Sequence, residues 1–169
     1  KNLPTRRLAV SGMIGAAYAV MAIFGSVFGL TFGPIQFRFS EALCVLPFFL
    51  PETAWGLGVG CLIANLLSPY GVLDIVVGSA ATLLAALLTA RCQKKWLAPL
   101  PPVIANTVLI GLVLAYEQAG TSAAFWPTYA FNALTVGLGE AVACYVLGTL
   151  LLRFLPKIPA LRKRMTLRH

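Results

Sequence analysis

The sequence predicts an all-α integral membrane protein, a six-transmembrane-helix bundle whose N-terminus and C-terminus are both cytoplasmic. The first observation is composition: 59% of the 169 residues are apolar and 11% are charged, whereas about a quarter of the residues in soluble domains are charged. The second is that the apolar runs reach about 20 residues, the length of a helix that crosses a ~30 Å hydrocarbon layer. The third is that Lys and Arg gather in alternate connections between these runs, as the positive-inside rule requires.

Six apolar stretches follow one another, separated by turns that contain Gly, Pro or charged residues. The first stretch, residues 8–28, lacks the small-residue cleavage motif of a secretory signal peptide at its end, so we expect a retained helix. The other five cover residues 41–50, 53–67, 74–90, 101–116 and 126–152.

The second and third stretches are short for full spans, about 15 Å and 22 Å long as helices. Residues 42–67 could instead form one long helix interrupted by Pro47 and Pro51. Charge favours six spans, because they place twelve of the thirteen Lys and Arg residues inside and leave only Arg38 outside. Short segments must be tilted, shielded or locally unwound, and irregular backbone is tolerated where it faces protein or a wet cavity. We therefore expect a cavity on the extracellular side near residues 33–41 and 65–74.

One domain is expected to cover residues 1–169, because neither an internal repeat nor a linker interrupts the pattern. Residues 36–40 alternate in polarity and are expected to be briefly extended. The positive-inside rule accounts for the net charge of +8, because Lys and Arg residues orient the helices in the membrane. We therefore expect membrane lipid as a partner and no nucleic acid.

The residues that intramembrane enzymes need are missing from the apolar segments. The only histidine is His169, and the cysteines form neither a C-x-x-C motif nor a Cys/His cluster. A zinc enzyme or an intramembrane serine protease is therefore excluded, and we predict no metal, cofactor or catalytic residue. We interpret the cysteines as small buried hydrophobic residues, namely Cys44, Cys61, Cys92 and Cys144.

The most informative polar residue is Glu140, which lies near the middle of the last apolar stretch. An ionised side chain at that depth costs several kcal/mol unless it is paired or hydrated, so it is a candidate for ligand contact. The alternative is a structural hydrogen bond to another helix, with Asn106 as the expected partner.

Polar side chains share one stripe of this last helix. Tyr129, Asn132 and Glu140 recur at helical spacing, together with Val136. A phenol, an amide and a carboxylate suit a planar polar heterocycle. Trp126, one turn before Tyr129, could stack on such a ligand or anchor the helix at the membrane interface.

The loop from Gly29 to Glu41 is the second candidate region. Its glycines and proline let it fold across a cavity mouth, and Gln36, Phe37, Arg38 and Glu41 are its candidate binding residues. Structural alternatives are an N-cap at Ser40 and an Arg38–Glu41 pair at i and i+3.

Asn65 and Asp74 complete the candidate binding residues, at the extracellular ends of the third and fourth stretches. Asp74 could instead be a plain acid at a helix start. Glu52 and Glu117 are interpreted as solvated turn and helix-end residues.

Small residues mark one face of the first helix. Ser11, Gly15 and Ala19 recur every four residues, and Gly12 and Ala16 adjoin them. Such faces let another helix approach closely in lipid, so this one serves either docking of a partner protein or packing inside the bundle.

The string from Gly33 to Leu43, followed by Leu46-Pro47, resembles the queuosine-precursor transporter (QueT) family. Members of that family are substrate-binding S components of energy-coupling factor (ECF) transporters. The likeness covers nearly the whole chain, and its further matching strings are Asn65-Leu66 with Gly71 and Asp74 downstream, residues 78–83, and Asn132 with Gly139-Glu140.

This resemblance implies a multi-pass S component of the bacterial plasma membrane that captures its ligand outside the cell. It implies a 7-deazaguanine as ligand, such as queuine or its aminomethyl precursor preQ1. It also implies docking, through the small residues of the first helix, on an ECF transmembrane T subunit with two ATPase subunits. The sequence contains no G-x-x-x-x-G-K-[ST] motif, so this chain is not expected to hydrolyse ATP and is not an enzyme.

Two other functions stay open at the level of sequence. The chain could be an S component for another vitamin. It could also be a ligand-free membrane assembly subunit, in which Glu140 and Asn132 would only join helices.

Overall fold

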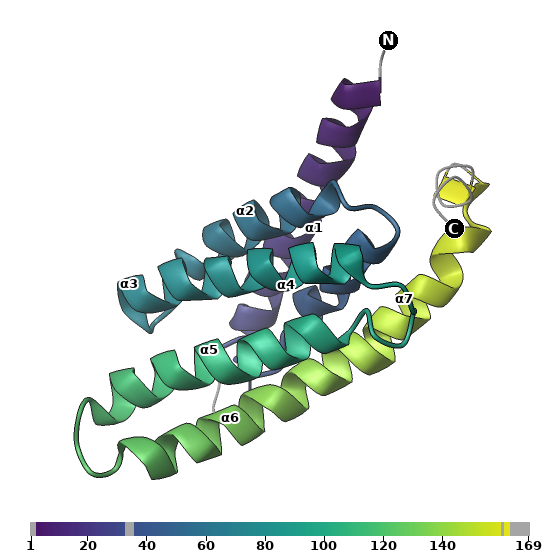
Figure 1. Cartoon of the computed structure of the whole chain (residues 1–169). Coiled ribbons are helices and arrows are strands. Elements are labelled where there is room, and N and C mark those ends of the chain that lie inside the picture. The colour runs from purple at the N-terminus through teal and green to yellow at the C-terminus, as the bar shows by residue number, and fades with distance from the viewer. Residues whose placement is uncertain (1–2, 33–35, 160, 163–169) are drawn as a thin grey trace.

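The computed structural model describes residues 3–32, 36–159 and 161–162, and the ordered elements among them are helices (Figure 1). Four helical runs are long and apolar enough to cross a membrane: Pro4–Val27, Gly71–Arg91, Leu100–Ala119 and Phe125–Lys157. Two shorter apolar helices, Phe39–Phe48 and Thr53–Asn65, lie between the first run and the second. The prediction of an all-α membrane protein is therefore confirmed, with four candidate spans and two short apolar helices.

The elements follow the predicted stretches closely. In chain order they are α1 (Leu3–Val27), the 3-10 helix η1 (Phe39–Phe48), α2 (Thr53–Asn65), α3 (Gly71–Leu73), the π-helix η2 (Asp74–Gly78), α4 (Ser79–Arg91), α5 (Leu100–Ala119), α6 (Phe125–Ala141), the π-helix η3 (Val142–Gly148), α7 (Thr149–Phe154) and the 3-10 helix η4 (Leu155–Lys157).

The outer surface is apolar and the interior is partly polar, as a lipid solvent requires. Along α6, for example, Leu134 and Leu138 are exposed, whereas Asn132 and Glu140 are buried. Lipid solvates the aliphatic side chains, but it offers no hydrogen bonds to amides or carboxylates, which therefore turn inward.

The alternative of a single helix over residues 42–67 is wrong. The chain forms η1, turns at residues 49–52 and restarts as α2. Pro51 cannot donate a backbone hydrogen bond, and Thr53 caps the turn through its side-chain hydroxyl, which donates to the Leu50 carbonyl over 2.6 Å.

The short helix η1 occupies the centre of the bundle. It packs against α1, α2, α4 and η3, and eight of its ten residues are buried. At ~2 Å per residue in a 3-10 helix, η1 is only about 20 Å long. Its shortness is tolerated because neighbouring helices shield it from lipid. Shielding is one of the three arrangements expected for the short segments.

Close contact between α1 and α2 depends on small residues. A Cβ atom added to Gly56 would lie 1.9 Å from the Ser11 carbonyl oxygen, and one added to Gly60 would lie 2.3 Å from the Gly15 carbonyl oxygen. The Ser11 hydroxyl also accepts a 2.9 Å hydrogen bond from the Gly56 backbone N–H. The helices therefore touch backbone to backbone.

Helices α5 and α6 run side by side as a hairpin (Figure 1). Pro101 and Pro102 stand in the first turn of α5, where their missing N–H groups cost nothing. Gly120, with φ of +55°, ends α5, because glycine tolerates the left-handed region that opens the turn.

Candidate functional site

A glycine turn returns the chain into the bundle after α1. Gly29 has φ of +70°, and the Leu30 N–H donates to the Gly25 carbonyl over 3.0 Å, as in a Schellman cap. The Thr31 hydroxyl donates to the Ala22 carbonyl over 2.9 Å, and the Phe37 N–H donates to the Leu30 carbonyl over 2.8 Å. Both sides of the loop are thereby fixed at its base, while residues 33–35 lie outside the described residues.

Glu41 is the centre of a first buried cluster. Its side chain is fully buried and accepts hydrogen bonds from the Tyr18 hydroxyl, from the Cys44 thiol over 3.0 Å and from the Asn106 amide over 3.3 Å. These donors come from α1, η1 and α5, so one carboxylate joins three elements.

Glu140 lies beside the same cluster. It is 5% exposed and points into the bundle, with Asn106 and Cys144 flanking its carboxyl group. The Cys144 thiol lies 3.8 Å from Glu140 Oε2 and 3.4 Å from the Glu41 carbonyl oxygen. We call Tyr18, Glu41, Asn106 and Glu140 the carboxyl cluster. Asn106 does lie beside Glu140, as the structural alternative expected, and its amide nitrogen also donates to Glu41 Oε2.

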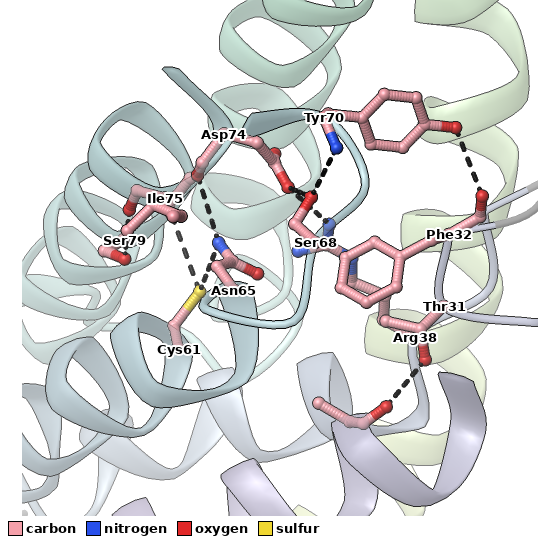
Figure 2. A network of polar contacts seen from close by, with 12 residues as sticks. Thr31, Phe32, Arg38, Cys61, Asn65, Ser68, Tyr70, Asp74, Ile75 and Ser79 are labelled. Carbon is pink, nitrogen blue, oxygen red and sulfur yellow. Dashed lines mark hydrogen bonds and ion pairs between the residues drawn. The ribbon is translucent and has the colours of Figure 1, made fainter. Parts of the chain in front are cut away.

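A second buried network surrounds Asp74 (Figure 2). Asp74 is fully buried; its Oδ2 atom accepts a hydrogen bond from the Ser68 hydroxyl and lies 3.9 Å from Arg38 Nη2. The Asn65 amide donates to the Asp74 carbonyl oxygen over 3.2 Å. We call Arg38, Asn65, Ser68 and Asp74 the Arg38–Asp74 network.

Aromatic residues close the Arg38–Asp74 network on the loop side (Figure 2). The guanidinium of Arg38 lies over the Phe32 ring at 5.3 Å from its centroid, and the Tyr70 hydroxyl donates to the Phe32 carbonyl over 3.1 Å. The loop after α1 and the turn after α2 therefore meet, whereas the extracellular cavity expected near residues 33–41 and 65–74 stays a prediction.

Several buried polar atoms in this region have no hydrogen-bond partner within the described part of the chain. Those in the loop and the Arg38–Asp74 network are Gln36 Nε2, Arg38 Nε and Nη2, Ser40 Oγ and Asp74 Oδ1. A buried polar group without a partner costs about 1–3 kcal/mol. Such a concentration marks a place where hydrogen-bonding capacity is available to a bound molecule.

Two structural alternatives for the loop are wrong. Arg38 pairs with Asp74 and not with Glu41, because the Glu41 carboxylate turns toward Tyr18 and Asn106. Ser40 does not cap a helix: η1 begins at Phe39 without a side-chain cap, and the Ser40 hydroxyl has no partner. Arg38 itself is extended, with φ of −104° and ψ of 102°, as predicted, but the predicted extended stretch is too long, because Phe39 and Ser40 already belong to η1.

The polar stripe of α6 is divided in the structure. Glu140 joins the carboxyl cluster, whereas the Asn132 amide donates to Gln118 Oε1 on α5 over 3.1 Å. Tyr129 is half-buried and lies 6.1 Å from the ring of Trp126, which is 69% exposed. Trp126 and Glu140 are fourteen positions apart on one helical run, which is about 21 Å. Among the described residues, the two ends of the stripe therefore have separate contacts.

Tyr18 is the residue that sequence reasoning missed. It lies in the middle of α1 and is almost fully buried, and a buried tyrosine hydroxyl almost always requires a partner. That requirement was a usable signal, but the partner is 23 residues away along the chain. Ser68 and Phe32 were also missed, although their contacts, Asp74 and Arg38, each lie only six positions further along the chain.

The five small residues of α1 fall into two groups. Ser11, Gly15 and Ala19 are buried in the bundle, and Ser11 and Gly15 touch α2, whereas Gly12 and Ala16 are exposed. The internal-packing alternative therefore describes Ser11 and Gly15, and only Gly12 and Ala16 of this set face outward.

Comparison with known proteins gives two matches. A sequence model described as QueT transporter matches residues 8–157. The chain is 31% identical over 100 residues to a curated relative named "Queuosine precursor transporter QueT" from Lactococcus lactis subsp. cremoris (strain MG1363). That alignment covers 57% of this chain and 59% of the relative's length. No solved structure matches the chain.

Proposed function

This chain belongs to the QueT transporter family, and we propose that it is the substrate-binding subunit of an importer for a queuosine precursor. The ligand is a 7-deazaguanine such as queuine or its aminomethyl precursor preQ1. The observation that carries the proposal is the pair of buried carboxylates, Glu41 and Glu140, next to a buried arginine inside an apolar bundle. Intramembrane ionisable groups are costly and mark ligand sites by default.

The chemistry of the site suits such a ligand. A guanine edge presents adjacent N–H groups, and a carboxylate accepts hydrogen bonds only. Charge supports the same ligand class, because Glu41, Asp74 and Glu140 face one cation, Arg38, in these buried networks. A ligand that carries an amine offsets the excess of carboxylates. The proposed contacts are Gln36, Phe37, Arg38, Glu41, Asn65, Asp74, Trp126, Tyr129, Asn132 and Glu140.

The proposed topology has six membrane crossings, with η1 and α2 as the second and third and with both termini in the cytoplasm. Contacts at one end of the bundle support it. Leu50, Ala98 and Leu155 share one buried cluster, with Val10 and Leu161 against it, and the segments that contain them are the ones that the charge pattern assigns to the cytoplasm. The Arg38–Asp74 network then faces the outside.

Energy for import is proposed to come from other chains. The chain would act as an ECF S component, docked on a transmembrane T subunit that carries two ATPase subunits. The proposed docking surface is the α1 face of Ser11, Gly12, Gly15, Ala16 and Ala19. Gly12 and Ala16 are its exposed members, so they would make the contact, while Ser11, Gly15 and Ala19 would hold the face in place from inside the bundle.

Binding by the purified chain tests the proposal. Isothermal titration calorimetry with queuine and with preQ1 should give dissociation constants in the nanomolar to micromolar range. Glu140→Gln should weaken binding by about tenfold to a hundredfold, since a hydrogen bond to a charged group contributes about 1.5–3 kcal/mol. Glu117→Gln is the matched control, because Glu117 is exposed at the end of α5.

The alternatives give different results in the same assay. Binding of riboflavin, thiamine or biotin in place of the deazaguanines would assign the chain to another vitamin. An unchanged melting temperature across the whole panel, together with co-purifying membrane proteins, would favour a ligand-free assembly subunit. Either result would refute the substrate proposed here.

A further inference from the structure

The unpartnered donors of the candidate site are concentrated in two residues of the loop. Gln36 and Arg38 are each 5% exposed, and Gln36 Nε2, Arg38 Nε and Arg38 Nη2 have no hydrogen-bond partner among the residues that the structure describes. All three atoms carry hydrogens and none can accept. This part of the site therefore offers donors to a bound molecule.

Both side chains are attached to backbone that the fold holds firmly. The Gln36 carbonyl oxygen packs on α6 so closely that a Cβ atom at Gly139 would lie 1.9 Å from it. Gln36 therefore lies against Gly139, the residue that precedes Glu140 in α6. Arg38 lies between the Phe32 ring and Asp74. The Ser68 hydroxyl donates to Asp74 Oδ2, and the Asn65 amide donates to the Asp74 carbonyl oxygen (Figure 2).

The contact between Arg38 and Asp74 leaves the guanidinium available. Its 3.9 Å separation is beyond hydrogen-bond length, which is 2.7–3.2 Å for N–H to oxygen. Asp74 therefore provides a counter-charge for the buried cation without using its hydrogens. An acceptor atom of a ligand can therefore bond to the guanidinium hydrogens without breaking an existing hydrogen bond.

Acceptors lie on the neighbouring elements. Glu41 on η1 donates its backbone N–H to the Arg38 carbonyl over 3.1 Å, and Glu140 on α6 directly follows Gly139, against which the Gln36 carbonyl packs. The region thus combines donors from the loop with carboxylate acceptors from the two helices. A ligand that fits both must present a hydrogen-bond acceptor beside its N–H donors.

We propose that Gln36 and Arg38 donate to the ring carbonyl oxygen of the ligand, while Glu140 accepts from the N–H groups next to that carbonyl. The proposal rests on the proposed function and adds its specificity: the site selects bases with the 6-oxo, 2-amino edge of guanine. A base that carries an amino group in place of the carbonyl brings donors against the donors of Gln36 and Arg38. Buried donors then stay unpaired, which is the strongest way for a site to reject an analogue.

Two bases that differ along this edge test this proposal on the purified chain. The probes are 7-deazaguanine and 2,6-diamino-7-deazapurine, in which an amino group replaces the C6 carbonyl and N1 changes from a hydrogen-bond donor to an acceptor, so the base opposes both the loop donors and Glu140. The wild-type chain should prefer 7-deazaguanine by about a hundredfold or more, since sites built around hydrogen bonds discriminate by large factors. The readout is the ratio of the two dissociation constants, in which general damage to the fold cancels.

Gln36→Leu should reduce this ratio at least tenfold. The unliganded variant should be as stable as the wild-type chain or more stable, because the substitution removes a buried donor that has no partner. Thr107→Val is the matched control, since Thr107 Oγ1 is also buried without a partner but faces α6 at Gly137. It should leave the ratio unchanged.

Arg38→Lys provides a second variant that keeps the cation beside Asp74 and removes the planar fork of donors. It too should lower the ratio. If both variants keep the wild-type ratio, the carbonyl is recognised elsewhere and the proposal is overturned, while binding of 7-deazaguanine still supports the proposed function. If neither base binds the wild-type chain, the proposed function fails and this inference fails with it.

Discussion

At the scale of single residues, Glu41 shows how a buried carboxylate organises its surroundings. It accepts hydrogen bonds from α1, η1 and α5, and it is fully buried. Breaking a buried network by removing its acceptor leaves several donors unpaired at once. Glu41 is therefore expected to contribute to folding as well as to ligand contact.

Replacement of Glu41 by glutamine tests this double role. The amide places donor hydrogens against the donors of Tyr18, Cys44 or Asn106, so the free energy of unfolding should fall by about 1–3 kcal/mol. Thermal unfolding in detergent, followed by circular dichroism, measures the change. Glu140→Gln should lower stability less, because in the described part of the chain fewer donors surround the Glu140 carboxyl group than the Glu41 carboxyl group. The opposite order would contradict the central position of Glu41.

At the scale of elements, α1 and α2 lie so close together that glycine is required where their backbones touch. Packing of this kind drives helix association in lipid, where the hydrophobic effect does not act between helices. Gly56 is the tightest point of this contact, because its added Cβ would lie 1.9 Å from the Ser11 carbonyl oxygen. That oxygen belongs to the backbone and cannot move aside as a flexible side chain can.

Gly56→Ala should therefore lower the melting temperature markedly, although alanine is the better helix former by about 1 kcal/mol. Gly12→Ala on α1 is the matched control, since nothing lies within 4 Å of its added Cβ. That control should leave the melting temperature unchanged or raise it. Equal effects of the two substitutions would show that the α1–α2 contact is looser than the structure indicates.

The exposed face of α1 leads to a separate expectation about partners. Ala16→Leu enlarges a side chain that points away from the bundle, so ligand binding by the isolated chain should persist. Uptake of the ligand by cells that also produce the energising subunits should fall, because the larger side chain obstructs close helix approach. Undiminished uptake would exclude this face as the docking surface.

At the scale of the whole molecule, the ends of the bundle differ in character. One end gathers Leu50, Ala98 and Leu155, and a cleft there is lined by Arg7, Glu52 and Trp55 among others. The Arg38–Asp74 network lies at the opposite end, where α2 finishes at Asn65. The turn between η1 and α2 thus shares an end with the start of α1, as six crossings require.

Cysteine accessibility tests this topology. In a Cys92→Ser background, a membrane-impermeant maleimide should label Ser122→Cys on intact cells. It should label Trp55→Cys and Gln93→Cys only in inverted vesicles, because the charge pattern places both in the cytoplasm. All three side chains are exposed in the structure. Labelling of Trp55→Cys from outside would mean that η1 and α2 do not cross the membrane.

The sequence by itself determined that lipid surrounds the helices, where the helical segments lie and which residues carry polar chemistry. Hydropathy, proline and glycine act locally, so each apolar stretch could be placed before any contact was known. The inward position of Glu140 could also be predicted, because a carboxylate inside the membrane is stable only where it faces the interior of the bundle and not the lipid. The resemblance carried by residues 33–47 supplied the family.

Only the tertiary structure decided which polar residues share a site. The Tyr18–Glu41 and Arg38–Asp74 contacts join positions far apart in the chain, and they depend on how each helix is rotated about its own axis. The division of the α6 stripe and the 3-10 geometry of η1 have the same origin, since neighbouring helices set both. Local rules fix where a helix begins and ends, but partners across the bundle are chosen by packing of the whole chain.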